Sequence, residues 1–200
     1  MQLLCSLTSP YARKARVVVI EKGLEDQVEF LIRNPTAEPQ GVIGTNPLGK
    51  IPALILHDGT VLYDSPVVCE YLDSLVPDPV LVPASGPARW SVLRLQALGD
   101  GILDATYNSV MESRRPAEQQ SADAILRWRG AIDRGVRALN AEAGGWDEGL
   151  DLGRLTAACA LGYLDFRMPQ VEWRDAAPAL AAWYEVIAKR PSLARTVPVG

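Results

Sequence analysis

Four prolines within residues 77–87 divide the chain into two parts with different patterns of apolar residues. Before this segment, short apolar runs that suit strands alternate with runs that suit helices. After it, only long segments with helical spacing follow. Because proline interrupts both helices and central strands, the segment is typical of a linker between domains. The pattern predicts an α/β domain over residues 1–76, a linker over 77–87 and an all-helical domain over 88–200.

The first part predicts a small sheet with helices packed on it. Strands are expected near residues 3–5, 28–32, 51–56 and 61–63, and helices over residues 11–22 and 67–75. Asp58-Gly59 between two apolar runs is typical of a two-residue hairpin turn, which would make the last two strands antiparallel. The stretch 34–49 is crowded with Pro and Gly and has room for a short helix at most. The expected order is βαβ, a crossover and then ββα.

Helical periodicity governs the second part. It predicts helices over about residues 90–112, 119–142, 152–166 and 179–189. Asp151 is expected to cap the third of these, whereas Arg154 stands where the usual capping box has an acceptor for the return hydrogen bond. We therefore expect an altered cap that lowers the local stability of this domain slightly and leaves its function intact.

Composition narrows the classes of function. The 200 residues carry a formal net charge of -4, and the arginines are scattered among acids, so no nucleic-acid partner is expected. No apolar run approaches the roughly 18 to 20 residues of a membrane span, and the first residues lack a basic leader. Three widely spaced cysteines suit a reducing compartment, and a single histidine without a His/Cys cluster indicates no metal site. We expect a cytoplasmic chain without membrane, metal or nucleic-acid partners.

Ser9, Pro10 and Tyr11 stand where the first helix should begin, directly after the first strand. Unpaired backbone N–H groups and the helix dipole favour an anion at such a place. A serine hydroxyl there can donate to a thiolate that a ligand supplies, and lowering a thiol pKa from ~8.5 to about 6.5 takes roughly 2.7 kcal/mol. Simple helix capping is the alternative role for Ser9, and Thr8 offers a second hydroxyl that could face the sulfur.

Two further segments offer groups that bind a peptide. Pro52 cannot donate within a sheet, so we expect it at a strand end after a cis bond that turns the Ile51 backbone outward for an extended peptide. At another helix start, Ser65 can bind a carboxylate and Asp64 can pair with an ammonium group. An ordinary loop and an ordinary helix cap are the structural alternatives for these two segments.

Three motifs together resemble the cytosolic glutathione transferases over essentially the whole chain. They are S-P-Y before a basic and then apolar helix, N-P-L-G-K-I-P at 46–52, and L-Y-D-S-P-V-V-C-E-Y-L-D at 62–73. The resemblance implies a thioredoxin-like amino-terminal domain that holds glutathione and an all-α carboxy-terminal domain that shapes the site for an apolar electrophile. Redox proteins of this fold carry Cys-Pro-Tyr-Cys at the first helix, and Ser9-Pro10-Tyr11-Ala12 has neither sulfur, which excludes disulfide exchange by this motif.

The resemblance also implies roles for single residues. Ser9, as in a serine-type active site, would orient the glutathione sulfur. Ile51 would pair through its backbone with the cysteinyl unit next to cis Pro52. Asp64 and Ser65 would hold the γ-glutamyl end, and Lys50 is a weaker candidate for the glycine carboxylate.

The remaining expectations concern the electrophile and the partners. The electrophile pocket is assigned to Tyr11, Tyr107 and Met111, with core packing as the alternative for the last two. The resemblance implies that glutathione is the co-substrate and that the protein is a detoxifying homodimer, and no other cofactor is expected. Arg13 and Lys14 should lie on a solvated or dimer-facing side of the first helix. The alternative function is a non-enzymatic protein on the same scaffold that acts through protein partners, like the stringent starvation protein.

Overall fold

The computed structural model describes residues 1–199, which form two compact units. Unit 1 comprises Met1–Ala84 together with the chain end from Pro191 onward, and unit 2 comprises Ser85–Arg190. The helical periodicity of residues 88–200 does not reveal that the chain end belongs with the first unit.

The sheet of unit 1 has four strands in the order β2-β1-β3-β4. The strands are β1 (Gln2–Cys5), β2 (Glu29–Ile32), β3 (Ala53–Ile55) and β4 (Val61–Leu62). β1 is parallel to β2 and antiparallel to β3, and β3 is antiparallel to β4. The predicted βαβ and ββα halves are therefore confirmed.

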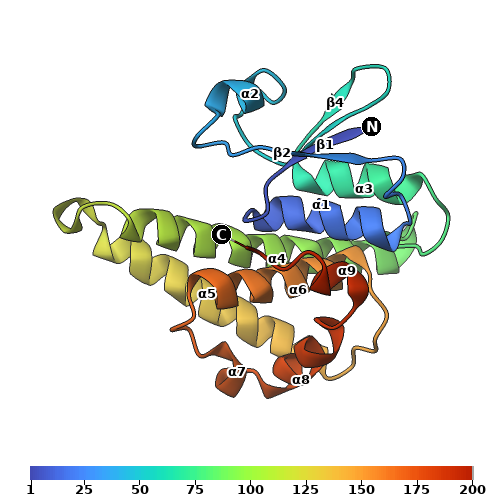
Figure 1. The fold of residues 1–200 in the computed structure, drawn as a ribbon. Coiled ribbons are helices and arrows are strands. Elements are labelled where there is room, and N and C mark those ends of the chain that lie inside the picture. The colour runs from blue at the N-terminus through green and yellow to red at the C-terminus, as the bar shows by residue number, and fades with distance from the viewer. Residues whose placement is uncertain (200) are drawn as a thin grey trace. The chain divides into compact units, whose positions relative to one another are not determined.

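The helices of unit 1 are α1 (Pro10–Glu21), α2 (Pro39–Ile43), α3 (Ser65–Ser74) and α9 (Pro191–Ala194). α1 and α3 pack side by side on one face of the sheet (Figure 1). Leu3, Val18, Leu54 and Leu72 are fully buried, so the core lies between the sheet and these two helices. α1 ends before Gly23, whose φ of 63° is a conformation that favours glycine.

The turn between β3 and β4 has three residues, whereas the Asp58-Gly59 pair suggests two. Leu56 N donates to Thr60 O at 2.8 Å, and Gly59 N donates to Leu56 O at 3.1 Å. A two-residue type I′ turn needs a positive φ at both central residues, but of this pair only Gly59 has one, at 85°. Asp58 instead accepts a hydrogen bond from Thr60 N at 2.9 Å. The antiparallel pairing is as predicted, with a different loop.

The chain end covers the side of α1 that carries Arg13. Arg13 is only 3% exposed, and its guanidinium donates to Leu193 O at 3.1 Å and to Thr196 Oγ1 at 3.3 Å. Lys14 is fully buried. The solvated side predicted for Arg13 and Lys14 is therefore wrong, and the dimer-facing alternative stays a prediction. For Arg13 the reason is that local periodicity says nothing of a segment about 180 residues away that returns to cover it.

Unit 2 is built from helices alone. They are α4 (Gly86–Ser113), α5 (Ala122–Ala143), α6 (Leu152–Arg167), α7 (Trp173–Ala176) and α8 (Pro178–Ile187), with a short 3-10 helix η1 (Ala117–Gln119). α4 begins at Gly86, inside the segment predicted as linker, and packs against both α5 and α6 (Figure 1). Across residues 1–199, no helix has both the length and the apolar character of a membrane span.

α4 and α6 approach each other closely at two glycines. A Cβ atom at Gly99 would lie 2.7 Å from Thr156 Cγ2, and one at Gly153 would lie 2.8 Å from Leu95 Cβ. Residues 95–99 therefore lie beside residues 153–156, and because the numbers rise together the two helices run parallel. Their carboxy-terminal ends therefore lie on the same side of this approach.

The cap of α6 is modified as expected. Asp151 accepts a hydrogen bond from Arg154 N at 2.8 Å. The Arg154 side chain cannot accept in return, and it instead forms ion pairs with Asp151 Oδ2 at 3.4 Å and with Asp147 Oδ1 at 2.5 Å. The hydrogen bond from Arg154 holds the pKa of Asp147 below its ordinary value.

Candidate functional site

Ser9 is the N-cap residue of α1. Its φ of -75° and ψ of 123° are extended, its Oγ accepts a hydrogen bond from Ala12 N at 3.2 Å, and Pro10 follows in the first turn. The Ser9 backbone N–H donates to Ser6 Oγ at 3.1 Å. Capping uses only an acceptor lone pair, so the Ser9 hydroxyl keeps its hydrogen to donate to a ligand. The capping role and the sulfur-binding role are therefore compatible.

Thr8 remains the alternative partner for the sulfur. Its hydroxyl lies 3.4 Å from Ser6 Oγ, and either oxygen can be the donor in that contact. Both Thr8 and Ser9 are half-buried. The geometry does not choose between the two hydroxyls.

The segment before β3 has the predicted cis bond. The Ile51–Pro52 peptide is cis, and both residues precede the first residue of β3. Within residues 1–199, no hydrogen bond engages the backbone N–H or C=O of Ile51. These two groups can therefore pair with an extended peptide. Lys50 is exposed, next to them in the chain.

Asn46 positions this segment, and sequence reasoning missed it. Its side chain is 1% exposed, donates from Nδ2 to Lys50 O at 2.8 Å and accepts from Leu48 N at 3.0 Å. The Asn-Pro pair at 46–47 is a recognisable turn signal. Nothing in that signal says that the amide reaches across the turn to Lys50.

Asp64 and Ser65 begin α3. Asp64 is the N-cap residue and Ser65 the first helical residue, so the cap lies one position earlier than predicted. Asp64 makes no side-chain capping hydrogen bond and is exposed, whereas Ser65 is 3% exposed. The Asp64 carboxylate is thus available for an ammonium group at a helix start whose N–H groups suit a carboxylate.

Strand register brings these three segments to one end of the sheet. Leu4 of β1 pairs with Ala53 of β3, so the chain leaves β1 toward Ser9 where Pro52 leads into β3. Leu54 pairs with Leu62 of β4, so the chain leaves β4 toward Asp64 at that same end. Hydroxyl, open backbone and carboxylate are therefore gathered within unit 1.

The predicted electrophile residues lie on helices of both units. Tyr11 is in the first turn of α1, in unit 1. Tyr107 and Met111 are one turn apart on α4, in unit 2, and are 44% and 41% exposed. These exposures exclude full burial in the core of unit 2, which was the alternative reading for both residues.

The cysteines and the histidine take no part in the site. Cys5, Cys69 and Cys159 form no disulfide and are fully buried. Burial raises the pKa of the Cys5 thiol to about 11, so it stays protonated at neutral pH. His57 is exposed in the hairpin loop, as expected. Within residues 1–199, no group of three His, Cys, Asp or Glu side chains could hold a metal ion.

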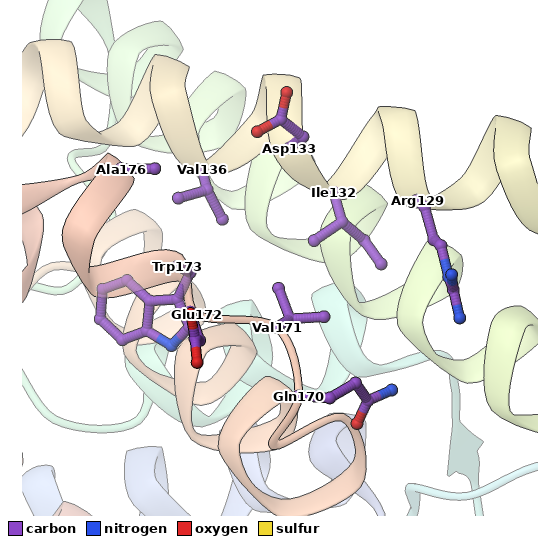
Figure 2. Close-up of a pocket in the computed structure, with 9 residues that line it drawn as sticks. All are labelled: Arg129, Ile132, Asp133, Val136, Gln170, Val171, Glu172, Trp173 and Ala176. Carbon is purple, nitrogen blue, oxygen red and sulfur yellow. The ribbon is translucent and has the colours of Figure 1, made fainter.

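A hollow of about 230 Å³ lies elsewhere, between α5 and the segment 170–176 of unit 2 (Figure 2). Its walls are mainly apolar, from Ile132, Val136, Val171 and Trp173, with Asp133 among the polar side chains that also line it. None of the predicted site residues lines it. It is a recess in the packing of unit 2 and not the candidate glutathione site.

Two protein-family descriptions match successive parts of the chain. Residues 8–75 match the N-terminal domain of glutathione S-transferase, and residues 122–185 match its C-terminal domain. The uncharacterized GST-like protein YibF of Escherichia coli (strain K12) is 37% identical over 201 residues, which cover 99% of this chain and 98% of that protein.

Two solved structures also match this chain over its whole length. A glutathione transferase family member from Pseudomonas fluorescens Pf-5, with bound glutathione, has 40% identity and a TM-score of 0.93, covering 100% of this chain and 99% of its own. A structure with bound S-(propanoic acid)-glutathione, from the same organism, has 40% identity and a TM-score of 0.89, with 100% of each chain covered. A stringent starvation protein A homolog from Pasteurella multocida (strain Pm70) is 30% identical over 130 residues, 63% of this chain and 60% of that protein.

The sheet with α1 and α3 on one face, joined to a unit of helices, defines a thioredoxin-like domain followed by an all-α domain. The chain matches both domain families, and it matches a relative of nearly the same length, so these comparisons identify its protein family. The chain belongs to the glutathione S-transferase family.

Proposed function

We propose that this protein is a glutathione transferase that binds glutathione in unit 1, lowers the pKa of its thiol and joins the sulfur to an electrophilic carbon. The observation that carries the proposal is the Ser9 hydroxyl, which caps α1 as an acceptor from Ala12 N and keeps its hydrogen for a ligand. Among the described residues, no base is hydrogen-bonded to Ser9, so the serine serves as a donor and not as a covalent nucleophile.

The other residues bind the rest of the tripeptide. The free N–H and C=O of Ile51 pair with the cysteinyl unit beside cis Pro52. Asp64 binds the γ-glutamyl ammonium, Ser65 its carboxylate, and Lys50 the glycine carboxylate. A relative with 40% identity holds glutathione in one structure and S-(propanoic acid)-glutathione in another, which supports glutathione as the ligand, and the second compound is a conjugate whose added group carries a carboxylate.

Calorimetric titration with glutathione, followed by turnover of 1-chloro-2,4-dinitrobenzene, tests the function. We expect saturable binding and catalysed release of chloride. A folded sample that shows no heat with millimolar glutathione would overturn the proposal.

Asp64→Asn and Ser65→Ala are expected to weaken glutathione binding by roughly 10- to 100-fold each, because a hydrogen bond to a charged group contributes about 1.5 to 3 kcal/mol. Calorimetry measures the dissociation constants. Asp58→Asn in the hairpin turn is the matched control, because the Asp58 carboxylate is engaged within its own turn, by Thr60 and by its own backbone N–H, and it should bind as wild type. Wild-type affinity in Ser65→Ala would show that the γ-glutamyl assignment is wrong.

A second candidate function has one observation in its favour. The match to a stringent starvation protein A homolog favours a protein that acts through partners on the same scaffold. That candidate predicts no glutathione binding and no effect of the Asp64 and Ser65 substitutions on any turnover. The calorimetric titration therefore separates the two.

The same proposal includes a homodimer in the cytoplasm. Sedimentation equilibrium is expected to give a mass roughly twice the 21.7 kDa of one chain. The three cysteines, which form no disulfide, suit the reducing compartment. A mass that stays at one chain over the micromolar range would contradict the dimer and leave glutathione binding to be judged by calorimetry.

A further inference from the structure

The Asn46 side chain closes the loop that leads to Ile51. Its backbone carbonyl accepts from Gly49 N at 2.8 Å, its Oδ1 accepts from Leu48 N at 3.0 Å, and its Nδ2 donates to Lys50 O at 2.8 Å. At 1% exposure these bonds lie away from solvent. Asn46 therefore uses its backbone and both ends of its carboxamide to hold one loop of unit 1.

The carboxamide is what holds the Lys50 carbonyl. Among residues 1–199, no donor other than Asn46 Nδ2 forms a hydrogen bond with Lys50 O. Lys50 lies outside the helices and strands, so no helical or sheet hydrogen bond fixes the plane of its peptide group. The Asn46 amide therefore sets the orientation of the peptide between Lys50 and Ile51.

That orientation determines where the Ile51 N–H points. The Lys50–Ile51 bond is trans, and in a planar trans peptide the C=O and the N–H point in opposite directions. Because Lys50 O points at the buried Asn46 amide, the Ile51 N–H points away from it. In the part of the chain that the structure describes, nothing accepts from this N–H. It is aimed at an acceptor that a ligand supplies.

The opposite orientation of this peptide would remove the donor from the site. A half-turn of its plane would direct Lys50 O toward the ligand, where it would face the cysteinyl carbonyl, and two acceptors cannot form a hydrogen bond. It would also leave the buried Asn46 Nδ2 without its acceptor, which carries a desolvation penalty. The Asn46 carboxamide therefore selects the orientation that suits a peptide ligand.

We propose that Asn46 is a positioning residue for glutathione, an inference that rests on the proposed function. Its carboxamide fixes the Lys50–Ile51 peptide so that Ile51 N–H donates to the cysteinyl carbonyl of the tripeptide. Asn46 acts through the backbone of its neighbours and not by contact with the ligand. Its effect on affinity should therefore concern that one carbonyl, and not the γ-glutamyl end.

The test compares glutathione with an analogue in which a trans-alkene replaces the Cys–Gly amide. The alkene keeps the shape of the amide but has no carbonyl to accept from Ile51 N–H. Calorimetry should show that wild type binds glutathione about 3- to 10-fold more tightly than the alkene, as expected for one hydrogen bond between neutral groups. Asn46→Asp at about pH 8 should lose this preference and bind the alkene within about twofold of wild type.

Asn46→Asp should also make the preference depend on pH. Burial at this position and the facing Lys50 O both disfavour a charged carboxylate, so the introduced carboxyl should have a pKa above its ordinary value. Its protonated form can donate to Lys50 O as the amide does, and its ionised form cannot. The preference for glutathione should therefore return as the pH falls from about 8 toward about 5, whereas wild type should keep it throughout.

Asn34→Asp is the matched control, because it makes the same change at an exposed asparagine of unit 1. Asn34 Oδ1 accepts from Thr36 N at 3.0 Å and from Ala37 N at 3.3 Å, and an aspartate keeps both acceptors. This variant should keep the wild-type preference at every pH. Asn46→Ser serves where Asn46→Asp fails to fold, and its shorter side chain should abolish the preference at every pH.

Loss of the preference in Asn46→Asp supports the proposal, and its return at low pH assigns the effect to the donor on Lys50 O. A wild-type preference in Asn46→Asp overturns the proposal, and so does an equal loss of affinity for both ligands, which a merely structural role predicts. Equal binding of the two ligands by wild type also overturns it. In each of these cases glutathione binding by wild type leaves the proposed function standing, whereas a wild type that binds neither ligand removes both.

Discussion

Ser9→Ala is expected to raise the pKa of the bound glutathione thiol by about 1 to 2, because a hydrogen bond to a charged group contributes roughly 1.5 to 3 kcal/mol. Ultraviolet titration of the thiolate in the complex measures this pKa directly. With less thiolate near neutral pH, kcat/KM for an aryl halide should fall by about 10- to 100-fold at pH 6.5. The loss should shrink as pH rises above the raised pKa, since the thiol then ionises without help.

Two other variants separate the roles of the Ser9 hydroxyl. Ser9→Ala also removes the cap on Ala12 N, which costs about 1 kcal/mol of stability. Ser9→Asp keeps a capping acceptor but has no hydrogen to donate, so the helix should hold while the thiol pKa rises further through repulsion. Thr8→Val removes the neighbouring hydroxyl and should leave the pKa unchanged. A raised pKa in Thr8→Val and an unchanged one in Ser9→Ala would assign the sulfur to Thr8.

Much of the structure of unit 1 could be predicted from short stretches of the sequence. The Ser9-Pro10 start of α1 and the glycine after its end depend on residues adjacent in the chain. The Ile51–Pro52 cis bond and the antiparallel strands around Gly59 are also properties of short segments. Where neighbours in sequence determine the backbone, the sequence predicted the type of element, although the hairpin loop has three residues and not two, and α3 is capped one residue earlier than expected.

Contacts between distant residues account for what was missed. Arg13 reads as a solvent-facing residue of an amphipathic helix, yet its guanidinium donates to Leu193 O, 180 positions away. Asn46 reads as a turn residue, and its role in holding Lys50 O requires the folded loop. In unit 2, α7 has only four residues, too few to show helical periodicity. Side-chain hydrogen bonds and short helices carry no periodic signal.

The proline-rich segment 77–87 is another place where contacts with distant residues could not be predicted from the sequence. Its composition predicts a loose linker, but residues 79–82 are bound to α1 and α3 through one buried ion pair. Asp73 Oδ1 accepts from Lys22 Nζ at 2.8 Å and from Leu81 N at 3.0 Å, and Oδ2 accepts from Val82 N at 2.9 Å. Lys22 Nζ also donates to Pro79 O at 2.6 Å. With side-chain exposures of 0% for Lys22 and 9% for Asp73, the pair is buried.

Asp73→Ala is therefore expected to cost about 3 to 5 kcal/mol of unfolding free energy, because it leaves a buried ammonium without its countercharge and two backbone N–H groups without an acceptor. Against a typical total of about 5 to 15 kcal/mol this is a large fraction. All five tryptophans lie in unit 2, so tryptophan fluorescence follows that unit. Urea unfolding should accordingly be followed by far-ultraviolet circular dichroism as well.

A control variant and a double variant test whether the loss of stability comes from the burial of the Lys22–Asp73 ion pair. Glu25→Gln breaks the exposed pair with Arg195 in the same unit and should lower the unfolding free energy far less than Asp73→Ala does, with a salt dependence that Asp73→Ala lacks. Lys22→Met/Asp73→Leu removes both charges and should be less destabilised than Asp73→Ala, since no unpaired charge then stays buried. Unfolding midpoints for Asp73→Ala and Glu25→Gln that coincide would mean that the ion pair does not hold the segment 79–82, and that the apolar contacts of Leu81 and Val82 hold it instead.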